Sequence, residues 1–147
     1  MTLDDRNEPQ LTIPFLNPLY RLLMPFAWPL VRCTVGVNLI VHGHDKLPRA
    51  IEIIGGAPPG NDSLPWLIWL VIAEFFAGIA VTIGLFTRFF APLAALELFH
   101  LAFIFRHHYN WRDDGFEYVL AWALILVAVS LRGGGPYSLD RRIGRSR

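Results

Sequence analysis

Ionisable side chains occur in the middle of apolar stretches of this 147-residue chain. Glu74 lies within the apolar run 64–86, and Glu97 and His100 lie within the next run, 88–105. A carboxylate at the centre of a membrane-spanning helix costs at least about 2.5–3.5 kcal/mol on insertion scales. Such a group therefore faces a protein interior, or lies on a path for a proton or a ligand.

Arg32 lies in the first apolar stretch and is the natural counter-ion for one of these carboxylates. From a rise of about 1.5 Å per residue, Glu74 and Glu97 fall near the bilayer midplane, and Arg32 falls there or slightly toward the cytoplasm. We therefore predict an Arg32–Glu74 ion pair. Because two carboxylates share one guanidinium, one of them is expected to be protonated or hydrogen-bonded to His100. Three roles stay open for these ionisable groups: they could fix the helix register, bind a ligand headgroup or relay protons.

Histidines continue from this cluster toward one surface, and histidine titrates in the range useful for proton transfer. His100 lies deepest in the predicted helix and is the strongest functional candidate among them. His107 and His108 are also explained as ordinary solvated loop residues. The candidates for a ligand site or proton path are Arg32, Glu74, Glu97, His100 and Glu117. The candidates at the outer face are His42, His44, Lys46, His107 and His108.

Metal or haem binding would need more ligands than the spacing supplies. The Glu97-x-x-His100 pair is half of the di-iron pattern of helix bundles, which requires two such pairs and two further glutamates. A single metal ion would need His42 or His44 together with His100, His107 and Glu117, and haem would need two histidines from different helices. We therefore assign no metal centre and disfavour haem.

The composition indicates an integral membrane protein, since 54% of the residues are hydrophobic and an ordinary soluble domain has fewer. A net charge of +1 gives no reason to expect a nucleic-acid partner. Cys33 is the only cysteine, which excludes an intrachain disulfide and a C-x-x-C redox pair. The acidic start of the chain is unlike a cleaved signal peptide.

Four apolar stretches predict an all-α bundle of four antiparallel transmembrane helices in a single domain, residues 1–147. The first helix is expected to begin between Tyr20 and Phe26 and to end near His42. The other helices are expected at about 64–86, 88–105 and 116–131. Gly36 and Gly43 share a face with Arg32, and Gly78 shares one with Glu74, so we expect these faces to pack together.

The segments between and around these helices are polar. We expect a loop at 42–65 with a short helix about 49–54, a polar N-terminal segment at 1–19 and a basic tail at 132–147. The tail arginines Arg141, Arg142, Arg145 and Arg147 are expected to be solvated, with contact to anionic headgroups as the alternative. Four spans place both termini on one side, and the excess of arginine there puts both termini in the cytoplasm.

Five short patterns, in this order, resemble the DoxX family of small four-helix bacterial membrane proteins. They are Arg32 followed by Gly36 and HGHDKL (42–47), then EFFAG (74–78), GLFTR (84–88), GFEY (115–118) and GGGPYSLDRR (133–142). The resemblance implies a multi-pass protein of the bacterial cytoplasmic (inner) membrane. It places Arg32, Lys46, Glu74 and Glu117 at recurrent family positions. Glu97 and His100 depart from the family pattern, which has mostly apolar residues there.

The family's namesakes are associated with a terminal quinol oxidase and with thiosulfate:quinone oxidoreductase, and relatives are linked to complexes that handle thiol and oxidative stress. By that analogy we expect an auxiliary subunit of a redox assembly, an oxidoreductase component only together with a partner. It would bind a quinone or similar lipid-soluble molecule between its helices, with Arg32, Glu74, Glu97 and His100 at the headgroup.

Two other functions stay open: a non-catalytic scaffold of a larger membrane complex, and a small proton-coupled transporter. The expected partners are membrane lipids and another membrane or redox protein, and self-association into a homo-oligomer stays open. No cofactor is assigned firmly.

Overall fold

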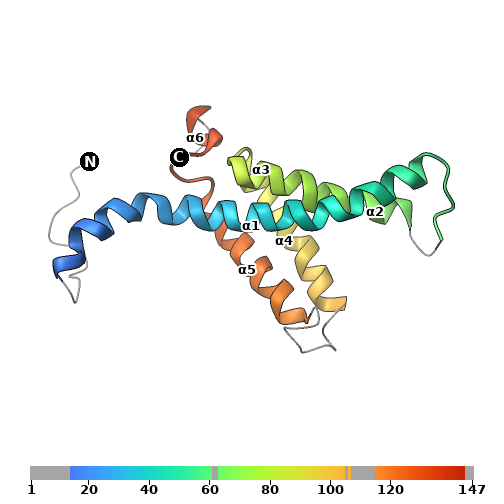
Figure 1. The fold of residues 1–147 in the computed structure, drawn as a ribbon, viewed down its shortest axis with the longest axis horizontal. Helices are drawn as coiled ribbons and strands as arrows, with labels where there is room; N and C mark the ends of the chain where they lie inside the picture. The colour runs from blue at the N-terminus through green and yellow to red at the C-terminus, as the bar shows by residue number, and fades with distance from the viewer. Residues whose placement is uncertain (1–13, 61–62, 105, 107–114, 145–147) are drawn as a thin grey trace.

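The computed structural model describes residues 14–60, 63–104, 106 and 115–144. Within these ranges the chain is helical and contains no strand (Figure 1). The elements are η2 (Pro14–Leu16), α1 (Asn17–Ile54), α2 (Leu64–Leu70), the π-helical turn η3 (Val71–Phe76), α3 (Ala77–Ile83), α4 (Thr87–Ile104), α5 (Phe116–Arg132) and α6 (Leu139–Arg142). Three helical stretches, 17–54, 64–83 and 87–104, are long and apolar enough to cross a membrane.

Helix α1 is longer than the sequence predicts. It begins at Asn17 and continues to Ile54 without the expected end at His42, so its 38 residues extend about 57 Å. Its last part is amphipathic: Ala50 and Ile53 are buried and pack with Leu67 and Val71. This apolar stripe stabilises a helical conformation in residues 42–54, although the glycine, proline and charged residues of that segment predict a loop.

The second stretch, α2–η3–α3, runs antiparallel to α1 and approaches its backbone closely (Figure 1). A Cβ atom on Gly43 would lie 2.7 Å from the Cα of Phe75, and one on Gly78 would lie 2.9 Å from the carbonyl oxygen of Gly36. Small residues permit such an approach between helices in lipid. The expected packing of the Gly36–Gly43 face against Gly78 is therefore confirmed.

Replacing Gly43 by alanine is expected to lower the free energy of unfolding by about 1–3 kcal/mol, because the added methyl group overpacks the contact with Phe75. Thermal unfolding in detergent micelles measures the change. The matched control is Gly55→Ala, whose Cβ would lie 3.4 Å from its nearest neighbours, an ordinary contact. Equal melting temperatures for the two variants would contradict the close approach.

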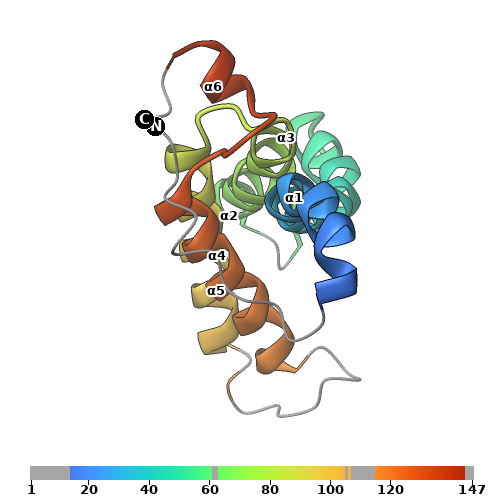
Figure 2. The same ribbon diagram turned by 90° about the vertical axis from the view of Figure 1, so that its left-hand side faces the viewer.

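Helices α4 and α5 form a hairpin that lies obliquely across α1 (Figures 1 and 2). The core between the two layers is built mainly from small and branched side chains. Its buried members are Val35, Leu39, Ala77, Val81, Ala91, Ala94, Ala95, Leu98, Ala123, Leu126 and Val129. The run of alanines on α4 lets α5 pack closely along it.

The segment that follows α5 folds back onto the turn between α3 and α4. The carboxylate of Asp140 accepts hydrogen bonds from the backbone N–H groups of Phe86 (2.7 Å) and Thr87 (2.9 Å), and the Asp140 N–H donates to the carbonyl of Gly84 (2.9 Å). The Trp28 indole donates to the carbonyl of Gly133 (3.0 Å). These bonds hold the segment 133–140 to the start of α4 and to α1. Of the arginines expected to be solvated, Arg141 and Arg142 are exposed.

Candidate functional site

A cavity of about 340 Å³ lies between α1, η3, α4 and α5. Its apolar wall consists of Leu39, Leu98, Leu101, Val119 and Trp122. Its polar groups are Asn38, His42, Lys46, Glu74 and Tyr118. A mostly apolar pocket of at least about 300 Å³ with a few convergent polar groups is the usual form of a small-molecule site.

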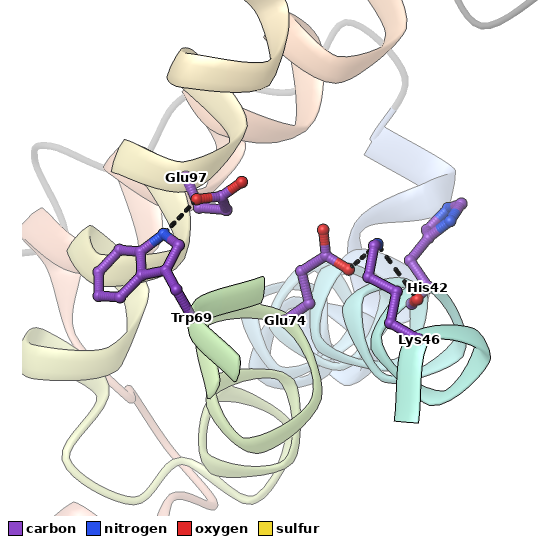
Figure 3. Close-up of polar contacts among 5 residues, drawn as sticks. All are labelled: His42, Lys46, Trp69, Glu74 and Glu97. Carbon is purple, nitrogen blue, oxygen red and sulfur yellow. Dashed lines mark hydrogen bonds and ion pairs between the residues drawn. The ribbon is translucent and has the colours of Figure 1, made fainter. Parts of the chain in front are cut away.

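Glu74 is the most deeply buried polar residue of this cavity, with 2% of its surface exposed. It lies in the π-helical turn η3, and π-helical turns often occur at functional sites. The ammonium group of Lys46 donates to the Glu74 carboxylate and to the carbonyl oxygen of His42 (3.3 Å), as Figure 3 shows. Glu74 and Lys46 therefore form a charged, hydrogen-bonded pair at the cavity wall.

The predicted Arg32–Glu74 ion pair is wrong, and the register of the helices explains why. The contacts of Gly36 and Gly43 align α1 with η3 and α3 so that Lys46 lies opposite Glu74. Arg32, 14 residues before Lys46, is displaced by about 21 Å along α1. Its guanidinium instead donates to the carbonyl of Gly134 in the tail.

A second polar contact on the cavity wall joins α1 to α5. The side-chain amide of Asn38 donates to the hydroxyl oxygen of Tyr118 at 3.2 Å. Asn38 precedes His42 by one helical turn, so both face the cavity from α1. Asn38 and Tyr118 are uncharged, so neither stands out in an apolar stretch of the sequence. The GFEY pattern that contains Tyr118 was the available signal.

Glu97 lies on α4 across from Glu74, with 1% of its surface exposed. The indole N–H of Trp69 donates to one carboxylate oxygen (Figure 3), and the other oxygen has no partner among the described residues. His100 does not share a hydrogen bond with Glu97 in the described part of the chain; its ring packs edge-on against Trp66 at 5.0 Å. For one of Glu74 and Glu97 the sequence predicted either protonation or a hydrogen bond to His100. Glu97 accepts its hydrogen bond from Trp69 instead of His100, and protonation of one carboxylate stays a prediction.

The remaining candidates are dispersed. His44 is exposed and lies 3.7 Å from Asp45, and Glu117 has one buried carboxylate oxygen without a partner among the described residues. His107 and His108 lie outside the described residues. Within the described ranges no three His, Cys, Asp or Glu side chains come together as a metal site would require, so His42, His100 and Glu117 form no such group.

Comparison with known families gave one result. A family model described as DoxX matches residues 27–107, more than half of the chain. The matched range includes Arg32, Lys46, Glu74 and Glu97, and it ends before Glu117 and Tyr118. Comparisons with curated proteins and with solved structures gave no match.

Proposed function

Because the chain belongs to the DoxX family, we propose that it is an auxiliary subunit of a membrane redox assembly that binds a quinone or similar lipid-soluble molecule. The binding site in this proposal is the cavity between α1, η3, α4 and α5. The observation that carries it is the Lys46–Glu74 pair at the wall of an otherwise largely apolar cavity.

The polar groups of the cavity have the chemistry that a quinone headgroup requires. Quinone carbonyl oxygens accept hydrogen bonds, and Lys46, Asn38 and Tyr118 carry donors. Reduction to the quinol takes up two electrons and two protons. In this proposal the protons pass through the polar groups of the cavity, and a partner redox protein supplies the electrons.

A groove next to the cavity supports binding of a long hydrocarbon tail. It is lined by Cys33, Thr34, Val37, Asn38, Val41 and Trp122. Asn38 and Trp122 belong to both the groove and the cavity, so the two hollows adjoin between α1 and α5. An isoprenoid chain entering from the lipid would lie in this groove while its headgroup reaches Lys46.

The proposed topology places α5 as a fourth span beside the three longer stretches. Its 17 residues rise about 26 Å, close to the thickness of a hydrocarbon core of about 30 Å. Both termini would then lie in the cytoplasm of a bacterium, with the protein in the inner membrane, because the arginine-rich ends share one side.

Replacing Glu74 by glutamine tests the ligand site. We expect the purified wild-type protein in lipid nanodiscs to retain quinone, and Glu74→Gln to weaken its binding about tenfold, because a charge-assisted hydrogen-bond network at the headgroup is lost. Chromatography of the extracted lipids measures the quinone retained for each protein. The matched control is Glu52→Gln, which replaces an exposed glutamate of α1 that pairs with Arg49 at 3.3 Å. No retained quinone in the wild type, or equal retention by both variants, would contradict the proposal.

A scaffold without its own ligand is the second candidate. The observation that favours it is the first part of α1, residues 17–27, which is exposed throughout and extends beyond the other helices (Figure 1). Such a segment offers a surface to a larger membrane protein. Under this alternative, Glu74→Gln lowers the amount of the assembled complex and leaves its turnover per molecule unchanged.

A further inference from the structure

A second hollow, of about 360 Å³, lies where α4 begins and α5 ends. It shares no lining residue with the cavity described above. Its lining residues are Phe86, Arg88, Phe89, Arg132, Gly133, Gly134 and Asp140. We call it the arginine hollow.

Two positive charges line the arginine hollow, and neither forms an ion pair with another described residue. The Arg132 guanidinium lies over the Trp28 ring, 4.5 Å from its centroid, and Arg88 lies against Gly133, where a Cβ atom would be 3.3 Å from its Nε. Asp140 is the one carboxylate of the lining, and both of its oxygens already accept backbone N–H groups. An anion with several acceptor oxygens would neutralise the two guanidinium groups and accept hydrogen bonds from both.

The apolar rim of the hollow indicates where the anion comes from. Phe86, in the turn before α4, and Phe89, in the first turn of α4, are 44% and 63% exposed. Both rings lie beside helices that are apolar enough to cross a membrane. A free inorganic anion has no group to cover these rings, whereas a phospholipid carries acyl chains beside its phosphate. Basic pockets at the ends of transmembrane helices are a known form of lipid headgroup site.

We propose that the arginine hollow binds the phosphodiester headgroup of an anionic membrane lipid. Arg88 and Arg132 hold the phosphate oxygens, and the acyl chains lie along Phe86 and Phe89. This site is independent of quinone binding, and it would attach the turn between α3 and α4 and the segment after α5 to one leaflet.

Lipid retention by a double variant tests this site. Native mass spectrometry compares the wild type, Arg88→Gln/Arg132→Gln and Arg141→Gln/Arg142→Gln after exchange into micelles containing phosphatidylglycerol or phosphatidylcholine. The control variant loses the same charge from the exposed surface of α6. We expect the wild type and the control to retain phosphatidylglycerol preferentially. Each arginine removed from the hollow should weaken that binding about fivefold, or about 25-fold for both.

Each other outcome overturns the proposal. Equal retention by all three proteins would show that the hollow binds no anionic lipid, and an equal loss in the control would show diffuse attraction by surface charge. Displacement of the lipid by millimolar inorganic phosphate would assign the hollow to a free anion. If the double glutamine variant does not fold, Arg88→Lys/Arg132→Lys keeps the charge but loses bidentate contacts; unchanged lipid retention by that variant would also contradict the proposal.

Discussion

Replacing Lys46 by methionine is expected to lower the free energy of unfolding by about 3–5 kcal/mol, because it leaves the Glu74 carboxylate buried without its cation. Glu74 is 2% exposed, so solvent compensates little for the loss of the ammonium group. Unfolding by a denaturing detergent in mixed micelles measures the difference. This is the largest effect that we expect from a single substitution in the cavity.

The double variant Lys46→Met/Glu74→Met distinguishes loss of the ion pair from loss of packing. Removing both charges leaves no unpaired carboxylate, so the double variant should be more stable than Lys46→Met alone. Arg142→Met serves as the control, since it removes one positive charge from an exposed position. A double variant as unstable as the single one would show that the aliphatic part of Lys46, and not its charge, stabilises the helices.

Replacing Asp140 by alanine is expected to release the segment after α5 from the start of α4. The substitution removes the acceptor of two backbone N–H groups, those of Phe86 and Thr87, and a hydrogen bond to a charged group contributes about 1.5–3 kcal/mol. Two such bonds contribute at least about 3 kcal/mol, so local opening should become at least about 100-fold more frequent. Hydrogen–deuterium exchange of these two amides measures the opening.

The neighbouring substitution Arg141→Ala is the control for this exchange experiment, because Arg141 lies on the exposed face of the same short helix. It should leave the exchange of Phe86 and Thr87 nearly unchanged. Protection of the two amides in Asp140→Ala at the wild-type level would show that the turn is held without the carboxylate.

The sequence predicted best the helices that coincide with long, mostly apolar runs between polar or glycine-containing turns. The expected third and fourth helices, 88–105 and 116–131, match α4 (Thr87–Ile104) and α5 (Phe116–Arg132) within one residue. The end of α1 was missed because residues 42–54 carry glycine, proline and charge. Burial of Ala50 and Ile53 against a neighbouring helix outweighs the local preference of such residues for a loop.

The candidate site could be predicted only in part. Glu74 was identified because an acidic residue in an apolar run has few explanations. Lys46 was not identified as its partner, because the pairing depends on how the glycines of α1 align with Phe75 and Gly78. The sequence of one helix alone does not determine this register. Asp140 was missed because one acidic residue among arginines resembles an ordinary surface charge.

The π-helical turn Val71–Phe76 contains one residue more than an α-helix would use over the same path. Deleting that residue would rotate the preceding part of the helix by about 100° relative to the following part. Gly78 would keep its contact with α1, whereas Trp69 would turn away from Glu97. A relative with one residue fewer in this turn would therefore keep the glycine contact with α1 but could not form the tryptophan–glutamate hydrogen bond, even if it carried both of these residues.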